Sequence, residues 1–238
     1  MVTNLDRERA KNFFADPRPY LQNNPYVDLR ADAVRRLLPW RAGMSVLDLG
    51  CGDGRISIPL VRESGDLLLV DSSAGMLDLA RSNVPPNVAD RVCCQCVDLA
   101  DFESQRRYDV VLCIGVLAHV PSPAATLRQV AQLVAPGGCA LVQLTDDAYC
   151  LGRLTHLAGA LRRRFVDASV HRLNHMTLGS VCAELRNEGL VLSSAYRYVF
   201  VPGLRRLPAA VTHTVVRAVN GSILSKRGGE VLALFARL

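Results

Sequence analysis

Three glycines alternate with other residues in the segment Val46-Leu-Asp-Leu-Gly-Cys-Gly-Asp-Gly54, directly after a short apolar stretch that carries Asp48. A strand that ends in such a loop brings bare backbone N–H groups and a helix N-terminus close to a ligand. The arrangement therefore predicts a nucleotide or nucleoside site. Its spacing is G-x-G-x-G, whereas the dinucleotide-binding pattern G-x-G-x-x-G would need a third glycine where this chain has Arg55.

An acid closes the next predicted strand, Leu67-Leu-Leu-Val-Asp71. A carboxylate at this position can accept hydrogen bonds from both ribose hydroxyls of an adenosine group. A dehydrogenase would place an acid there too, so Asp71 alone does not separate the two classes of protein. Met76, on the helix that follows, could lie against the face of an adenine ring.

Strand and helix patterns alternate along the chain, which predicts a parallel, doubly wound α/β sheet. Strands are expected at residues 46–49, 67–71, 92–97, 108–114, 141–145, 191–201 and 231–237. Helices are expected at residues 5–14, 27–38, 55–62, 72–81, 149–165, 177–187 and 207–219. Thr177 is expected to cap its helix and Gly189 to end it, while Pro136-Gly-Gly is expected to end the helix before the fifth strand.

Five segments stand in an order and at intervals that resemble class I S-adenosylmethionine-dependent methyltransferases, especially the small-molecule branch that includes quinone-biosynthesis enzymes. They are VLDLGCGDGR, LLLVDSSAGMLDLAR, CVDLADF, YDVVLCIGVLAHV and LVAPGGCALV, all within residues 45–145. The resemblance implies a mostly parallel seven-stranded sheet with an antiparallel last strand and a helical cap. It also implies one domain, with N-terminal helices over the site (1–40), a cofactor-binding core (41–145) and a lid with the closing strands (146–238).

The same resemblance implies S-adenosyl-L-methionine as the cofactor and S-adenosyl-L-homocysteine as its product. Asp48 would face the cofactor's ammonium directly or through water, Asp71 its ribose, and Asp98 its adenine amino group. Leu99 would lie against the adenine ring, and Ile114 would contribute backbone beside the methionine part. The expected cofactor-binding residues are Asp48, Gly50, Cys51, Gly52, Gly54, Asp71, Ser72, Met76, Asp98, Leu99 and Ile114.

His119 is the first candidate for catalysis, because it follows the fourth strand, where the methyl group should lie. It could take a proton from a substrate hydroxyl, or it could order its loop or pack on the cofactor. His175 is the rival base. No metal is expected. In the cluster Cys93-Cys-Gln-Cys96 side chains alternate along a strand, and no paired His/Cys motif follows.

The favoured function is O-methylation of a hydroxyl on a small molecule. The exit of the fourth strand reads Cys113-Ile-Gly-Val116, not the Asn/Asp-Pro-Pro-Tyr/Phe motif of enzymes that methylate exocyclic amines of bases, so no nucleic-acid partner is expected. N- or C-methylation of a metabolite, an NAD(P)-linked oxidoreductase and an inactive cofactor-binding module remain open alternatives.

Composition favours a cytoplasmic protein with one large core. Half of the 238 residues are hydrophobic, yet no apolar run approaches the roughly 20 residues of a spanning helix, and the charged N-terminus does not resemble a signal peptide. Eight cysteines without a disulfide pattern indicate a reducing compartment. Those in predicted strands are expected to be small buried hydrophobes: Cys93, Cys94, Cys96, Cys113 and Cys139.

Charge is unevenly distributed: basic residues strongly outnumber acidic ones after residue 150, whereas acids are slightly in excess before it. Either a solvated surface or an anionic partner, such as an anionic or apolar-tailed acceptor, would explain this. In the helix near 207–219, Arg206, His213 and Arg217 lie opposite a predicted apolar stripe. That layout suits either a helix packed on the core or one in peripheral contact with a membrane, and packing is favoured because the strand expected at 231–237 must return to the sheet. The oligomeric state stays open. The stripe consists of Leu204, Leu207, Val211, Val215 and Ala218.

Overall fold

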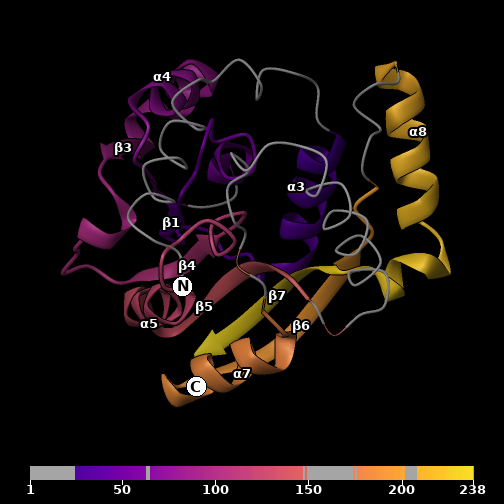
Figure 1. The fold of residues 1–238 in the computed structure, drawn as a ribbon. Coiled ribbons are helices and arrows are strands. Elements are labelled where there is room, and N and C mark those ends of the chain that lie inside the picture. The colour runs from indigo at the N-terminus through magenta and orange to yellow at the C-terminus, as the bar shows by residue number, and fades with distance from the viewer. Residues whose placement is uncertain are drawn as a thin grey trace, which may run out of the picture.

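The computed structural model describes residues 25–62, 65–146, 148, 174, 176–201 and 208–237. These residues form one seven-stranded sheet with the strand order β3-β2-β1-β4-β5-β7-β6 (Figure 1). The first five strands pair in parallel, and β7 runs antiparallel to both β5 and β6, so the predicted fold class is confirmed. The strands are β1 (Val46–Leu49), β2 (Leu67–Asp71), β3 (Val92–Cys96), β4 (Tyr108–Cys113), β5 (Val134–Thr145), β6 (Leu190–Tyr198) and β7 (Glu230–Arg237).

Helices connect most of the strands, and several begin at caps that the sequence indicates. Thr177 caps its helix through a reciprocal pair of hydrogen bonds with Ser180, as its position predicted, and Gly189 follows the last turn with a φ of 79°. The α-helices are α3 (Pro25–Leu37), α4 (Ala74–Asn83), α5 (Pro123–Leu133), α7 (Leu178–Asn187) and α8 (Ala209–Asn220). The 3₁₀ helices are η1 (Ile58–Arg62), η2 (Pro86–Arg91), η3 (Leu99–Asp101) and η5 (Ile223–Arg227).

The sheet is buried on both faces, as a parallel sheet requires. On one face, α3, α4 and η1 pack over side chains such as Val46 and Leu112. On the other face, α5 and α7 cover side chains such as Leu47 and Val111 (Figure 1). Because neighbouring strand residues point to opposite faces, Asp48 shares the α3 and α4 face with Val46. The alternation therefore places a carboxylate among apolar side chains just below the glycine loop.

One predicted helix and one predicted helix boundary were wrong. The segment after Gly54 forms turns and then the short η1 instead of a helix over 55–62, because Pro59 has no N–H to donate to an α-helical ladder. Helix α5 ends at Leu133, not at Pro136, because β5 already begins at Val134 and pairs with β4 through an irregular register. The predicted helices at 5–14 and 149–165 lie outside the described residues.

The buried face of α8 also differs from the predicted stripe. Thr212, Val216 and Asn220 are buried, whereas Val211 is 45% exposed. Asn220 accepts a hydrogen bond from the backbone N–H of Val199 and donates one to its carbonyl, which anchors this face of the helix beside β6. Leu204 and Leu207 lie outside the described residues. Neither α8 nor any other helix in the described part of the chain is long and apolar enough to cross a membrane.

The expectation that the strand cysteines are buried holds for the central strands only. Cys113 of β4 and Cys139 of β5 are buried, but Cys93 and Cys96 are exposed. Their strand, β3, forms one edge of the sheet, so it lacks a neighbour on one side. Burial of a strand residue depends on the position of its strand in the sheet, which the local sequence did not reveal.

Candidate functional site

A cleft of about 430 Å³ opens at the carboxyl ends of β1, β2, β3 and β4, with α3 along one wall. Ligands of open α/β sheets bind at this edge, where the strand order reverses direction. The structure brings most of the predicted site residues together there. Those that line the cleft are Gly50, Cys51, Gly52, Asp71, Ser72, Met76, Asp98, Leu99, Ile114 and His119.

The loop after β1 depends on its three glycines. Gly50, Gly52 and Gly54 have φ values of 71°, 57° and 69°, a region that other residues rarely adopt. A Cβ atom at Gly50 would collide with Val116, and one at Gly54 with Ile58. The conformation and the close packing therefore both require glycine. Gly54 itself does not line the cleft, so its role is to let the loop turn onto η1.

Asp71 ties the glycine loop to the end of β2. Its Oδ2 accepts a hydrogen bond from the backbone N–H of Gly52 (2.9 Å), and its Oδ1 accepts one from Ser73 (2.9 Å). Burial raises the pKa of this carboxyl, while the backbone donors at Ser73, Gly52 and Ser72 oppose the rise. A carboxylate so placed, at the floor of a cleft, can accept further hydrogen bonds from a ligand's hydroxyls.

Asp48 lies below the loop rather than on the cleft surface, with only 4% of its area exposed. Burial raises its pKa to about 7, and the negative charge of Asp71 adds to the rise. At neutral pH the buried carboxyl is therefore populated in both its protonated and its ionised form. A cation bound above the loop would stabilise the ionised form.

Apolar side chains lie at the β3 side of the cleft. Met76 is 2% exposed, and Leu99 is half-buried on the turn after β3. Asp98 caps the short η3 by accepting a hydrogen bond from the N–H of Ala100 (3.1 Å). Gln129 of α5, which sequence reasoning missed, donates to the carbonyl of Leu99 (2.8 Å) and so fixes this turn.

His119 lies half-buried in the turn after β4, where it lines the cleft. Its backbone N–H donates to the carbonyl of Val116 (2.8 Å). Asn174, far along the chain, clamps the same turn: its backbone N–H donates to Ala118 (2.8 Å), and its side-chain amide donates to Leu117 (3.1 Å) and Val120. No local pattern marks Asn174, because its partners are more than fifty residues away.

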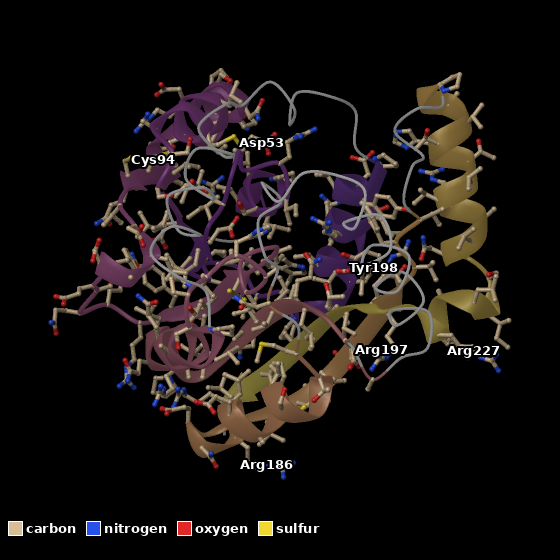
Figure 2. The ribbon with its side chains drawn as sticks, in the orientation of Figure 1. Asp53, Cys94, Arg186, Arg197, Tyr198 and Arg227 are labelled. Carbon is tan, nitrogen blue, oxygen red and sulfur yellow. The ribbon has the colours of Figure 1, made fainter. Side chains whose placement is uncertain are left out.

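The wall opposite the glycine loop contains a polar cluster that sequence reasoning also missed. Arg30 of α3 and Gln143 of β5 both line the cleft, and both donate to the hydroxyl of Tyr198 (3.0 and 2.8 Å). Tyr198 is fully buried at the end of β6, next to α3 (Figure 2), and burial raises the pKa of its hydroxyl. In the sequence, the one signal for this cluster was the pair Tyr196 and Tyr198, which alternate with other residues along β6 and so share a face of the strand.

His175, the rival base, lies outside the described residues. Asp48 and Gly54 are described but do not line the cleft. Within the described ranges, no group of three or more His, Cys, Asp or Glu side chains is arranged to hold a metal ion.

Comparison with known sequences matches residues 22–194 to a family described as a methyltransferase domain. A ubiquinone biosynthesis O-methyltransferase from Alkalilimnicola ehrlichii is 34% identical over 112 residues, which cover 46% of this chain and 45% of that protein. A ubiquinone biosynthesis O-methyltransferase from Xanthomonas euvesicatoria pv. vesicatoria is 29% identical over 171 residues, which cover 69% of this chain and 70% of that protein. Several such matches span only about half the length of the relative.

Solved structures share the fold over nearly the whole chain. A magnesium protoporphyrin IX methyltransferase from Synechocystis PCC 6803 with bound SAH superposes with a TM-score of 0.68 at 17% identity, covering 98% of this chain and 100% of that one. The same enzyme with bound SAM gives a TM-score of 0.64 at 16% identity, covering 98% and 97%.

Proposed function

The chain belongs to the class I S-adenosylmethionine-dependent methyltransferases, and from this membership we propose that it methylates a hydroxyl group of a small molecule. Its cofactor is S-adenosyl-L-methionine, which supplies an electrophilic methyl group when it is bound. The observation that carries the proposal is the division of one cleft into two parts: the glycine loop with Asp71 on one side, and His119 with the Arg30 and Gln143 wall on the other.

The first part fits the cofactor. Gly52 lines the cleft with a φ of 57°, and a Cβ atom there would stand 3.3 Å from the side chain of Met76, which lines the cleft too. We propose that this loop holds the methionine part of the cofactor and that the carboxylate of Asp48, below the loop, balances the charge of its ammonium group. Asp71 would accept hydrogen bonds from the ribose hydroxyls, and Asp98 would accept one from the adenine amino group. The remaining contacts would come from Cys51, Ser72, Met76, Leu99 and the backbone of Ile114.

The second part fits proton removal from an acceptor hydroxyl. His119 is held on a turn with fixed backbone, which keeps its imidazole at the cleft wall. In the proposed reaction the imidazole takes the hydroxyl proton as the oxygen attacks the methyl carbon, a role that typically contributes 10²–10⁴-fold to the rate. Holding both reactants in line contributes as well, since alignment alone is worth about 7–11 kcal/mol.

A small acceptor agrees with the size of the cleft, because its volume of about 430 Å³, within the usual range of about 300–1,000 Å³ for small-molecule sites, must take both the cofactor and the acceptor. Relatives named as O-methyltransferases support oxygen as the nucleophile. We further propose that residues 1–40 and 146–238 supply the cover of the acceptor, around the core of residues 41–145. Asn174, which clamps the turn of His119, is one described link between the core and this cover.

The test is methyl transfer from S-adenosylmethionine that carries a deuterated methyl group. Phenols, aliphatic alcohols, primary amines and carbon acids are offered separately, and mass spectrometry follows both the labelled product and S-adenosylhomocysteine. We expect label on oxygen acceptors only. Label confined to amines or carbon acids would replace O-methylation with the N- or C-methylation alternative. Tight cofactor binding without turnover on any acceptor would favour an inactive binding module.

A further inference from the structure

The wall of the cleft that we assign to the acceptor contains a cation, Arg30, for which the described residues supply no carboxylate partner. Arg30 uses its Nε–H to hydrogen-bond the Tyr198 hydroxyl (3.0 Å). A guanidinium has five N–H donors, so four remain on the two terminal nitrogens. Among the described residues, no carboxylate forms an ion pair with Arg30, although it is only half-exposed on the wall of the cleft. Such a group can bind an oxyanion through two parallel hydrogen bonds.

Gln143, its neighbour on the wall, has a side-chain oxygen that receives no hydrogen bond from any described residue. The side-chain amide lies 2.9 Å from a carboxylate oxygen of Glu230, and a carboxylate can only accept hydrogen bonds. The atom facing Glu230 must therefore be Nε2, which also donates to Tyr198. This fixes the orientation of the amide and leaves Oε1 buried with no donor among the described residues. An unsatisfied buried acceptor costs about 1–3 kcal/mol.

The nearby carboxylate of Glu230 forms no direct ion pair with Arg30 among the described residues. Glu230 accepts hydrogen bonds from Gln143 (2.9 Å) and from the Thr145 hydroxyl (2.8 Å), so both of its oxygens have a donor at the start of β7. Both Arg30 and Gln143 converge on the hydroxyl of Tyr198, which places the unpaired cation and the unpaired acceptor side by side. The pair is complementary to a ligand that carries an oxyanion close to a hydrogen-bond donor.

We infer that the methyl acceptor carries an oxyanion that pairs with Arg30, next to a hydroxyl or other donor that binds Oε1 of Gln143. This inference rests on the proposed function, since it assigns a chemical class to the acceptor of that same cleft. Arg30 and Gln143 are then specificity-determining residues, and Tyr198 is the positioning residue that aligns them. The oxyanion is a carboxylate or a phosphate, and the two sources are separated by the probes below.

The experiment measures binding by calorimetry in the presence of saturating S-adenosylhomocysteine, so that no turnover is needed. The probes are 4-hydroxybenzoate, 4-hydroxyphenyl phosphate and the neutral 4-hydroxybenzamide, which share one phenol and differ in charge. We expect at least one anion to bind the wild-type protein at least tenfold more tightly than the amide. Arg30→Gln should abolish this preference, and Arg30→Lys, which keeps the charge, should retain part of it.

Arg36→Gln is the matched control, because Arg36 is exposed on the same helix and does not line the cleft. It should keep the full preference for the anion, and all variants should bind S-adenosylhomocysteine as the wild type does. Equal binding of the three probes, binding of none, or a preference that survives Arg30→Gln would overturn the inference. Methyl transfer to neutral phenols together with equal binding would leave the proposed function intact and remove only the oxyanion.

Discussion

The carboxylate of Asp71 accepts a hydrogen bond from the backbone N–H of Gly52, at 2.9 Å, across 19 residues of chain. The same side chain lines the cleft and also bonds the N–H of Ser73. One carboxylate therefore fixes the shape of the glycine loop, begins the turn into α4 and remains available to a ligand. The conformation of the glycine loop and the proposed contact with the ribose are therefore linked through this residue.

Replacing Asp71 with alanine should weaken cofactor binding. Hydrogen bonds to a charged group are worth about 1.5–3 kcal/mol, so the affinity for S-adenosylmethionine should fall by about 10- to 150-fold in calorimetry. Asp78→Ala is the control, because Asp78 lies exposed on α4 and pairs with Arg81 away from the cleft. Unchanged affinity in the Asp71 variant would contradict the assignment of this residue to the ribose.

Asp48 should make the ligand-free protein less stable as the pH rises from about 4 to about 7. Its pKa is about 7 in the folded protein and near 3.8 in an unfolded chain, so only the folded state keeps the proton in this range. The free energy of unfolding should therefore decrease up to pH 7 and then level, by on the order of 4 kcal/mol from this group. Urea unfolding from pH 4.5 to 8 measures the change.

Asp48→Asn is the comparison for that measurement, because it keeps the shape of the side chain without the ionisation. The difference in unfolding free energy between wild type and variant should change across this pH range and stay constant above it. A difference that does not vary with pH would mean that Asp48 is ionised in the folded protein throughout. Titrating groups that do not act on Asp48, such as Asp109 with its lowered pKa, contribute equally to both proteins and cancel, whereas Asp71, whose charge raises the pKa of Asp48, belongs to the pH-dependent difference.

Local patterns were sufficient for the sheet and for the cofactor side of the cleft. The glycine spacing at 50–54 and the acid at Asp71 depend on residues within one strand–loop unit, and the cap at Thr177 on residues within one turn. Their conformations follow from backbone sterics and from nearby hydrogen bonds, which sequence displays directly.

The acceptor side could not be predicted in the same way. Arg30 and Tyr198 are 168 residues apart, and Gln143 and Tyr198 are 55 apart, so only the strand order brings them together. The face of α8 was misassigned for a related reason: the hydrogen bonds of Asn220 to the backbone of Val199 outweigh the apolar stripe that periodicity favoured. Polar contacts between distant segments leave no period in the sequence.

Removing one partner of a buried ion pair should greatly reduce the free energy of unfolding. Asp146 is 1% exposed, and Arg197 donates to it at 2.7 Å between the end of β5 and β6 (Figure 2). Arg197→Ala would leave this carboxylate buried and unpaired, at a cost of about 3–5 kcal/mol in unfolding free energy by urea titration. The exposed Arg186, on the last turn of α7, is the control, and its alanine variant should change stability by less than about 0.5 kcal/mol. Equal effects of the two variants would show that the pair is not isolated from solvent.

His119→Ala should lower the turnover number by about 10²- to 10⁴-fold on the acceptor identified by the deuterium assay, with cofactor affinity close to that of the wild type. The reason is that the imidazole would accept the hydroxyl proton but not contact the ribose or adenine side of the cleft. His213→Ala is the control, because His213 lies on α8 near Asp28, outside the cleft lining. Turnover within about threefold of wild type would assign the base to another residue, with His175 next to be tested.

Asn174→Ala should reduce turnover through the position of His119 and not through direct contact with substrate. Its amide donates to Leu117 and Val120, and its backbone N–H to Ala118, so the side chain holds both sides of the turn that carries the imidazole. Loss of two hydrogen bonds should let the turn move, which lowers the turnover number about tenfold or more while the KM for the cofactor stays constant. Asn187→Ala, at an exposed position on α7, should leave both constants unchanged.

The decisive measurement is the turnover number of the double variant Asn174→Ala/His119→Ala. If Asn174 acts by positioning His119, its removal should have almost no further effect once His119 is already alanine, whereas independent roles would multiply the two losses.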